Sequence, residues 1–405
     1  MNGCSKSNSN STPAAKLSIT ALSVSTGSYT TTATLTGTGF NNTAILNQVF
    51  FNGVAAPVQS VNSAGTSLSV AVPLATGTGN VTIKVNGVTA TGPVFTYQPA
   101  EVVSLLAGGA ATGYADGTGG NAAFSGPSGI VSDAAGNVYV IDQLNRLIRK
   151  VTPAGVVTTL AGSGAPGYAD GQGVSASFSK PFGIAIDSAG NLYVTDEINN
   201  LIRKITPTGL VSTIAGNRTT VSTNGPANAV GFLNPTALAV DASGNIFVAD
   251  QGAGKIQKIS TANVVSTVYS DNTISPYGLT LDKSGNIYIT SNYQILKITQ
   301  AGISSVFAGS GSSGKMDGTG TAASFNNAIG IAFDNSGNLF VTDQNFSAIR
   351  KITSAQVVTT FTGAGANAVG PLAQVTFADL EAITIDTSGN IYVIEGNEIV
   401  KIAFE

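Results

Sequence analysis

Apolar and polar residues alternate in short runs along most of the chain, and the runs end at turns rich in Gly, Pro or Asn. The runs at 33–36 and 68–72 are examples. Successive side chains of a strand point to opposite faces, so such runs predict half-buried strands. No segment keeps apolar residues at helical spacing over three turns. The pattern therefore predicts an all-β protein.

Residues 16–98 predict a small β-sandwich, because strand-length runs follow one another with Gly-containing turns between them. Four elements resemble the IPT/TIG family of immunoglobulin-like domains: Gly37-Thr38-Gly39-Phe40, Val49-Phe50-Phe51-Asn52-Gly53, the strand ending Val72-Pro73 and the closing run 92–97. In extracellular bacterial proteins such domains usually act as spacers. The resemblance therefore implies a spacer over 16–98.

Residues 99–405 contain six internal repeats, each with an Asp-x-x-Gly-Asn turn followed by an apolar strand. The six repeats begin their turns at Asp133, Asp187, Asp241, Asp282, Asp334 and Asp386. The Gly-Asn pair supplies the positive φ angles of a tight hairpin, and each repeat predicts four strands. Six four-stranded repeats predict a six-bladed β-propeller, whose sheets bury their faces against each other.

The two ends of this region predict how the propeller closes. The sixth repeat stops near Phe404, before any fourth strand, whereas the run 101–107 ahead of the first repeat matches the fourth-strand pattern. We expect that run to complete the last blade, which removes an exposed strand edge.

The repeats resemble NHL repeats. The resemblance rests on the Asp-x-x-Gly-Asn core, the (Ile/Leu)-Arg-Lys-Ile strand and the Pro-x-Gly-Ile run that begins at Pro127 and Pro181. It implies a binding platform first, although a minority of related propellers are enzymes with a His-ligated zinc or a calcium-dependent site. The fourth repeat departs most from the pattern, with Ser291 in place of the second Asp.

Composition removes several chemistries. The chain has no His, no Trp and one Cys, which excludes Ser-His-Asp and Cys-His catalysis, His-ligated metals and an intrachain disulfide. A net charge of −3 leaves no electrostatic footprint for nucleic acid. No apolar run is long enough to span a bilayer.

The amino terminus, Met1-Asn2-Gly3-Cys4 followed by a Ser/Asn-rich run, resembles the lipid-attachment site and tether of a bacterial lipoprotein. On this interpretation Cys4 carries lipid and residues 1–15 form a flexible tether. We expect a cell-envelope protein, held at the outer membrane or exposed to the periplasm or the outside, that touches membrane only through its anchor. An ordinary terminus with an incidental Cys is the alternative.

A second set of acidic residues ends the second strand of five repeats, with Ser291 in the remaining place. These residues are Asp142, Asp196, Asp250, Asp343 and Glu395. Together they form a candidate metal site, since carboxylate oxygens are the ligands of Ca²⁺. They equally suit capping of the following loops. The turn Asp residues and a Lys recurring in every repeat are interpreted as structural, and no cofactor is expected, with Ca²⁺ as the open alternative.

The loops that vary between repeats supply the binding candidates, because recognition concentrates on variable loops of rigid scaffolds. The candidates are Tyr114, Tyr168, Tyr293, Phe346, Arg146 and Asn200. We predict a monomeric, non-catalytic envelope protein that presents the propeller's loop face to a protein or glycan, with no nucleic-acid partner. The alternative is a calcium- or carboxylate-dependent hydrolase or lyase.

Overall fold

The computed structural model describes residues 15–29, 31–73, 76–98, 101–109, 111–361, 370–371, 375 and 377–404. The chain forms two compact units that divide between Glu101 and Val102. No helix in these ranges is long and apolar enough to cross a membrane. Cys4 and nearly all of the predicted tether lie outside the described residues.

The amino-terminal unit is a sandwich of two sheets. The first sheet has the order β1 (Ser18–Leu22), β3 (Thr32–Thr38), β7 (Ser67–Ala71) and β6 (Val58–Val61). The second has the order β2 (Thr26–Gly27), β9 (Val88–Tyr97), β8 (Gly79–Val85), β4 (Gln48–Phe51) and β5 (Val54–Ala56), with the turn η1 at Ala44–Leu46. Alternating residues of both sheets, such as Leu35, Val70 and Ile83, are fully buried in one core, as the alternation in sequence predicts.

The second unit consists of six blades, which we number in chain order. Blade 1 contains β12 (Pro127–Ser132), β13 (Val138–Asp142), β14 (Leu147–Val151) and β15 (Val156–Ala161). Blade 2 contains β17 (Pro181–Ile186), β18 (Leu192–Asp196), β19 (Leu201–Ile205) and β20 (Leu210–Ala215). Blade 3 contains β22 (Pro235–Val240), β23 (Ile246–Asp250), β24 (Lys255–Ile259) and β25 (Val264–Ser270).

The remaining blades follow the same order. Blade 4 contains β26 (Leu279–Leu281), β27 (Ile287–Ser291), β28 (Gln294–Ile298) and β29 (Ser304–Ala308). Blade 5 contains β31 (Ala328–Phe333), β32 (Leu339–Asp343), β33 (Ala348–Ile352) and β34 (Val357–Thr360). Blade 6 contains β36 (Leu380–Ile385), β37 (Ile391–Glu395), β38 (Glu398–Phe404) and β10 (Glu101–Gly108).

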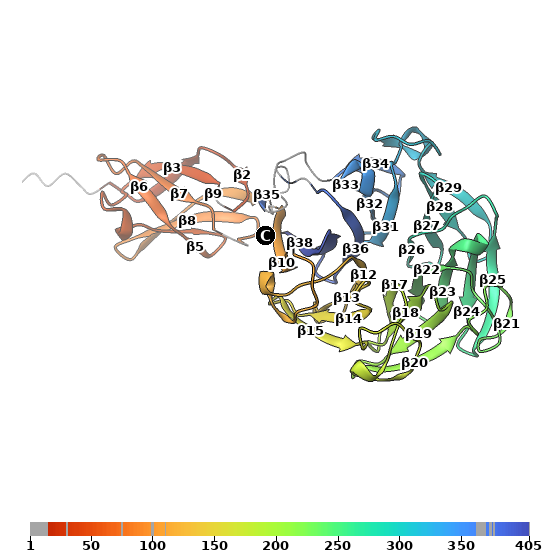
Figure 1. The fold of residues 1–405 in the computed structure, drawn as a ribbon. Coiled ribbons are helices and arrows are strands. Elements are labelled where there is room, and N and C mark those ends of the chain that lie inside the picture. The colour runs from red at the N-terminus through yellow and green to blue at the C-terminus, as the bar shows by residue number, and fades with distance from the viewer. Residues whose placement is uncertain are drawn as a thin grey trace, which may run out of the picture. The chain divides into compact units, whose positions relative to one another are not determined.

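The blades form a closed ring around a central channel. Their first strands contact one another in the order β12, β17, β22, β26, β31, β36 and back to β12, and Figure 1 shows these six strands around the middle of the ring. Blade 6 is completed as the sequence predicts, because β10 pairs beside β38 in its sheet. Val103 and Ala107 of β10 are fully buried, so the added strand also contributes core.

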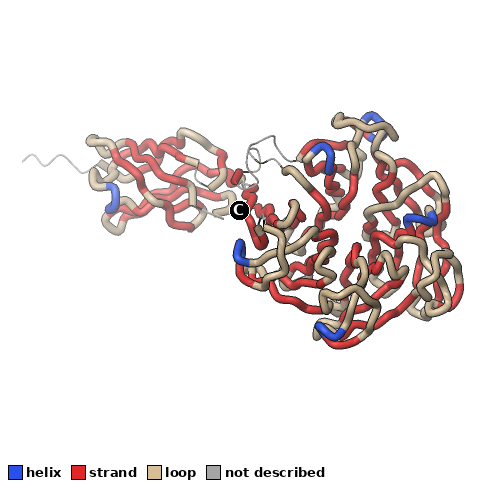
Figure 2. Tube along the Cα trace, in the orientation of Figure 1, coloured by secondary structure: helices blue, strands red, loops and turns tan. Residues whose placement is uncertain are grey.

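Five blades have a further two-residue strand on the outer edge. The strands are β11 (Gly117–Thr118), β16 (Gly171–Gln172), β21 (Gly225–Pro226), β30 (Gly318–Thr319) and β35 (Gly370–Pro371). All five belong to the segments that precede their blade's first strand, which we call inserts. Short 3-10 turns flank several of these strands, namely η2 (Gly119–Asn121), η3 (Gly173–Ser175) and η5 (Gly320–Ala322), and Figure 2 shows the short helical turns toward the outside of the ring. Each insert thereby covers an edge that would otherwise be open.

The repeated Asp of each hairpin holds its own turn. In blade 1, Asp133 accepts hydrogen bonds from the backbone N–H of Ala135 at 3.0 Å and of Asn137 at 2.8 Å, and from the Asn137 side chain at 2.8 Å. Asp241 of blade 3 makes the same three contacts with Ser243 and Asn245. The Asp is therefore required by the turn in the way an Asx turn requires it.

The glycine of the Pro-x-Gly run lets neighbouring blades approach closely. A Cβ added at Gly183 would lie 2.1 Å from the Thr236 carbonyl oxygen of blade 3, and one at Gly278 would lie 2.1 Å from the Ile329 carbonyl oxygen of blade 5. The Thr195 hydroxyl donates to that Thr236 oxygen at 2.7 Å. Only Gly permits this backbone contact, which ties adjacent blades at the channel.

Candidate functional site

One face of the propeller collects the strand ends that the sequence singles out. In blade 1, Pro127 at the start of the first strand pairs with Asp142 at the end of the second, and Pro181 pairs with Asp196 in blade 2. The inserts and the loops between second and third strands meet this same end of each blade. We call it the loop face.

The acidic residues at the second-strand ends are used within their own blades. The Asp142 carboxylate accepts the Ser125 N–H at 2.8 Å, Asp250 accepts the Leu233 N–H at 2.6 Å, and Asp343 accepts the Asn326 N–H at 2.7 Å. Asp196 and Glu395 bind insert N–H groups in the same way, and Ser291 Oγ accepts the Ser275 N–H at 3.0 Å. The four Asp side chains are completely buried. These contacts are the loop capping that the sequence left open beside a metal site.

Three blades add an arginine clamp that the sequence analysis missed. In blade 1 the fully buried Arg149 lies 2.8 Å from Asp142 and 2.7 Å from Asp116 of the insert, and it also donates to the Ala115 and Ala123 carbonyls. The other two clamps join Arg203 to Asp170 and Asp196, and Arg350 to Asp317 and Asp343. Each clamp fastens an insert to its blade. The sequence contains a signal for the clamps, because an insert Asp occurs in the same three repeats that have Arg on the third strand.

Blade 3 carries a neutral version of this arrangement. Gln257 occupies the Arg position and Asn224 the Asp position, and Thr267 Oγ1 donates to Asn224 at 2.9 Å. Without an Arg, the Oδ2 atom of Asp250 has no hydrogen-bond partner among the described residues. Burial raises the pKa of Asp250 to about 6, although Ser222, the Leu233 N–H and Lys255 oppose the shift. Among the four fully buried Asp carboxylates, Asp250 is the one that faces no arginine.

The geometry does not gather these carboxylates around one ion. Within the described ranges no group of three or more Asp, Glu or Cys side chains could hold a metal. Burial raises the pKa of Asp142, and it raises that of Asp343 to about 6 despite the facing Arg350 guanidinium. A site made of Asp142, Asp196, Asp250, Asp343 and Glu395 therefore lacks the convergence that a Ca²⁺ ion needs.

Two of the predicted binding residues line one notch on the loop face. Tyr114 and Arg146 border it together with Leu144 and Val174. Tyr114 is 73% exposed, Leu144 62% and Val174 66%. Arg146 reaches the Gly164 carbonyl at 3.3 Å. The notch combines an aromatic ring, a cation and exposed aliphatic surface.

The other predicted binding residues lie apart from this notch. Tyr168 is half exposed and has the Arg218 guanidinium 3.7 Å from its ring centroid. Tyr293 is 40% exposed in blade 4, and Phe346 of blade 5 packs beneath Lys315 at 5.5 Å. The prediction of Asn200 as a ligand contact does not fit the structure. Asn200 is only 4% exposed, and its side-chain oxygen accepts the Asn234 N–H at 3.2 Å. Asn200 therefore serves the loop fold and offers a ligand little surface.

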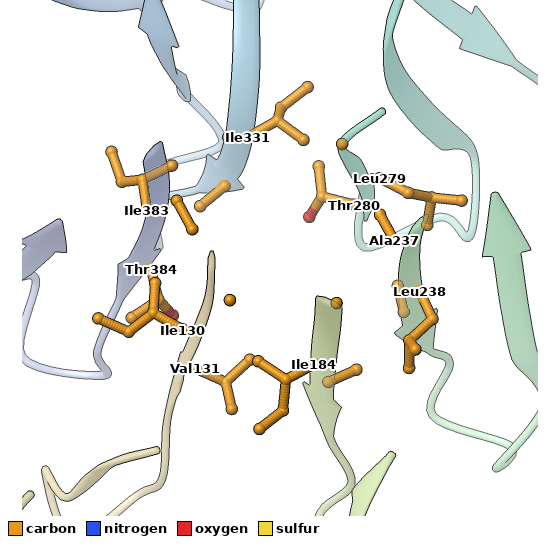
Figure 3. A pocket seen from close by; sticks show the side chains of 18 of the residues that line it. Ile130, Val131, Ile184, Ala237, Leu238, Leu279, Thr280, Ile331, Ile383 and Thr384 are labelled. Carbon is orange, nitrogen blue, oxygen red and sulfur yellow. The ribbon is translucent and has the colours of Figure 1, made fainter. Parts of the chain in front are cut away.

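The central channel holds a cavity of about 300 Å³ between the six first strands. Its wall is mainly aliphatic, and Figure 3 shows Ile130, Ile184, Leu238, Ile331 and Ile383 around an open centre. Thr280 and Thr384 supply hydroxyls to the wall. The size lies at the lower end of cavities that hold small organic molecules.

At the loop-face end of this cavity, one position per blade carries a different side chain each time. The six residues, which we call the mouth residues, are Ser128, Phe182, Thr236, Tyr277, Ile329 and Glu381, and all of them line the cavity. Each follows directly on the residue that begins the Pro-x-Gly run or its counterpart. Their divergence at one repeat position is visible in the sequence, although no motif marks it.

Aromatic and charged groups meet at the mouth. The rings of Phe182 and Tyr277 stand edge to face, with centroids 5.2 Å apart. Gln344 donates to Glu381 Oε1 at 2.8 Å and to Asp379 at 3.3 Å. Burial, reinforced by the Asp379 carboxylate, raises the pKa of Glu381 to about 7. Lys180 forms an ion pair with Glu197 at 2.8 Å and lies 5.7 Å from the Phe182 centroid.

Comparison with known proteins identifies the class of each unit. A model of the IPT/TIG domain family matches residues 17–97, so the amino-terminal unit is a TIG domain, and the second unit is a β-propeller. A stretch of 91 residues is 40% identical to Protein SUPPRESSOR OF QUENCHING 1, chloroplastic, of Arabidopsis thaliana. That stretch covers 22% of this chain and spans only 9% of the relative's length.

Solved structures resemble nearly the whole chain. An auxiliary nutrient binding protein from Bacteroides ovatus is 18% identical with a TM-score of 0.72, over 96% of this chain and 97% of that one. An auxiliary nutrient binding protein from Bacteroides thetaiotaomicron is 18% identical with a TM-score of 0.64, again over 96% of this chain and 97% of that one. The structure of a putative gluconolactonase is 12% identical with a TM-score of 0.52, over 75% of this chain and 92% of that one. At these identities the likeness shows the fold.

Proposed function

We propose that this protein is a non-catalytic binding protein of the bacterial cell envelope that captures its ligand on the loop face of the propeller. The TIG domain acts as a spacer, and a lipid on Cys4 is the link to the membrane. The ligand is a glycan or a protein displayed at the cell surface or in the periplasm, and the chain binds it as a monomer.

The divergence of the loop face carries this proposal. The carboxylates that recur in the blades are engaged in hairpins, caps and clamps, whereas the mouth residues and the notch around Tyr114 and Arg146 differ between blades. A single ligand breaks the equivalence of repeats, so a binding surface must be built from positions that differ. A role in binding also agrees with the nutrient binding proteins of similar fold.

Affinity electrophoresis against a panel of polysaccharides, with and without Ca²⁺, tests the proposal. We expect one glycan to retard the chain. Tyr114→Ala, which removes the exposed ring of the notch, should abolish the retardation. Tyr29→Ala is the matched control, because this partly exposed Tyr lies in the TIG domain. Its mobility should equal that of the unchanged chain.

Two results would redirect this proposal. Retardation that survives Tyr114→Ala but is lost in Tyr29→Ala would assign binding to the TIG domain and remove its role as a spacer. Absence of retardation by every polysaccharide would favour a protein ligand, to be captured from envelope extracts with Tyr114→Ala as the non-binding control.

Glu381 favours a second candidate, a carboxylate-dependent hydrolase or lyase. A half-buried carboxyl with its pKa near 7 can exchange a proton at neutral pH, and such groups are frequent in active sites. Incubation with lactones and glycans, followed by NMR, distinguishes the two. Turnover that Glu381→Gln abolishes would establish the enzyme and overturn the non-catalytic proposal.

A further inference from the structure

We infer that the channel mouth binds a small organic cation, whose charged nitrogen lies against Glu381 and the aromatic pair while its apolar body enters the channel. This inference goes beyond the proposed function and concerns a second, smaller ligand. Its first support is the cavity itself, which is bounded by Phe182, Tyr277 and Glu381 at the loop face and by aliphatic side chains below. A ligand with one charged end and one apolar end matches that gradient.

The sign of the charge follows from the residues at the mouth. Glu381 is the one Asp, Glu, Lys or Arg among the described residues that line the cavity. Its Oε1 accepts from Gln344, whereas Oε2 has no hydrogen-bond partner in the described part of the chain. The nearby Lys180 is already paired with Glu197 at 2.8 Å. An anion would meet Glu381 and Asp379 uncompensated, and a cation would offset the desolvation of Glu381.

The aromatic pair strengthens this selection. Phe182 and Tyr277 both line the cavity, and they come from equivalent positions in blades 2 and 4 around the mouth, with Thr236 of blade 3 between them. The negative face of an aromatic ring attracts cations, most strongly where water is excluded. The Lys180 ammonium already lies 5.7 Å from the Phe182 centroid, which shows that this ring accepts a cation. The rings therefore provide a second favourable contact for a cation.

The same residues argue against a metal ion. One lining carboxylate with Asp379 beside it falls short of the six to eight oxygens that Ca²⁺ takes, and no described cluster of three acidic or Cys ligands exists. Below the mouth the wall offers the hydroxyls of Thr280 and Thr384 but no further carboxylate, and side chains such as Ile130 and Leu238 cannot coordinate an ion. They do favour burial of a hydrocarbon body, by about 25 cal/mol for each Å² removed from water.

Calorimetric titration with three compounds of similar size tests the inference. Benzylammonium, benzyl alcohol and benzoate share a ring and differ in charge. At pH 8.5, where Glu381 is ionised, we expect benzylammonium to bind at least about tenfold more tightly than benzyl alcohol, and benzoate more weakly still. At pH 5.5 protonation of Glu381 should remove most of the preference. Asp379, Glu197, Lys180 and Tyr277 are the other titratable groups at the mouth.

Two variants locate the effect. Glu381→Gln keeps the size of the side chain and should lower benzylammonium affinity about tenfold while leaving benzyl alcohol unchanged. Asp271→Asn removes one negative charge from a loop outside the cavity, so it should change neither. Both variants are first compared with the unchanged chain by thermal melting.

Equal binding of the three compounds, equal loss in both variants, or no benzylammonium binding at any pH would overturn the inference. Such results leave the proposed function standing if polysaccharide retardation persists and remains sensitive to Tyr114→Ala. Conversely, the chain could prefer benzylammonium as expected while no polysaccharide retards it. That result would overturn glycan binding on the loop face and leave the inference about the channel mouth standing. The two proposals can therefore fail separately.

Discussion

The hairpin turns and the channel mouth each use one position in every blade. The turn position keeps the same residue in all repeats, whereas the mouth position has a different residue in each. The turn position is Asp in all six repeats, and each Asp binds backbone N–H groups of its own hairpin. The mouth position is Ser, Phe, Thr, Tyr, Ile and Glu in turn. The loop-face clamps lie between these extremes, with Arg in three blades and Gln in one.

This contrast separates what each blade needs for itself from what the ring needs once. A turn makes contacts within its own blade, so six blades have the same requirement six times. The mouth is one site shared by all blades, and no two blades contribute equivalently to it. Repetition along this chain therefore marks architecture, and loss of repetition at a channel-lining position marks the candidate binding surface.

Breaking a clamp should change the stability of the propeller most. Arg203→Ala leaves the fully buried Asp196 carboxylate without its cation and releases Asp170 of the insert. We expect a loss of about 3–5 kcal/mol in the free energy of unfolding of the propeller, because removal of one partner strands a buried charge. Urea denaturation measures it. Lys204→Ala, next on the same strand, is the control and should cost less than about 1 kcal/mol. A loss in Arg203→Ala as small as that expected for the control would contradict a stabilising role of the clamp.

A pH-dependent effect should follow from the unclamped Asp250. Its pKa is raised in the folded state to about 6, so its ionisation destabilises the fold, and this cost is absent below pH ~4 and complete above pH ~6. The advantage of Asp250→Asn over the unchanged chain should therefore grow by roughly 2–3 kcal/mol between pH 4 and pH 7. Urea midpoints at a series of pH values give this difference. A constant offset would contradict the raised pKa.

Introducing the clamp into blade 3 tests whether the Arg–Asp contacts also stabilise a blade that lacks them. Asn224→Asp and Gln257→Arg reproduce the residues of blades 1, 2 and 5, and the Asn224–Thr267 contact already matches the Asp116–Thr159 contact. We expect a favourable coupling of about 1–2 kcal/mol in a double-mutant cycle, since the introduced guanidinium would compensate both carboxylates. Additive single effects would indicate that the blade 3 insert follows a different path.

A substitution at the mouth itself should change stability least. Tyr277→Phe removes a hydroxyl that has no hydrogen-bond partner among the described residues. We therefore expect the free energy of unfolding to change by no more than about 0.5 kcal/mol, as measured by thermal melting. The adjacent Gly278→Ala places a Cβ 2.1 Å from the Ile329 oxygen and should destabilise strongly. A large effect of Tyr277→Phe would make the mouth part of the architecture.

Much of the fold was predictable from local sequence. The alternation of apolar residues, the Asp-x-x-Gly-Asn turns and the orphan strand near 101–107 predicted the strands, the blades and their closure, because all three depend on periodicity and turn chemistry. The second-strand acids were harder. Their spacing predicts that they share one face, and only the folded structure shows that each accepts N–H groups of its own blade.

The site residues were predicted only in part. Exposed rings such as Tyr114 followed from the variable loops, whereas Asn200 proved to be buried by the neighbouring insert. Comparison of the repeats shows that Glu381 and Tyr277 diverge, but only the folded ring shows that they line one cavity, because they lie about 100 positions apart in the chain.

Local sequence was enough to establish the all-β class, the TIG-like unit, the six repeats and the absence of His and disulfide chemistry, since composition, period and turn residues act over short stretches of chain. The Arg and insert Asp residues of each clamp occur in the same repeat, so that pairing is visible in the sequence. Which carboxylate remains at the channel mouth emerged only from the folded ring, because ring closure brings Glu381 together with residues of remote repeats. The burial of Glu381 and its neighbouring charge follow from that arrangement.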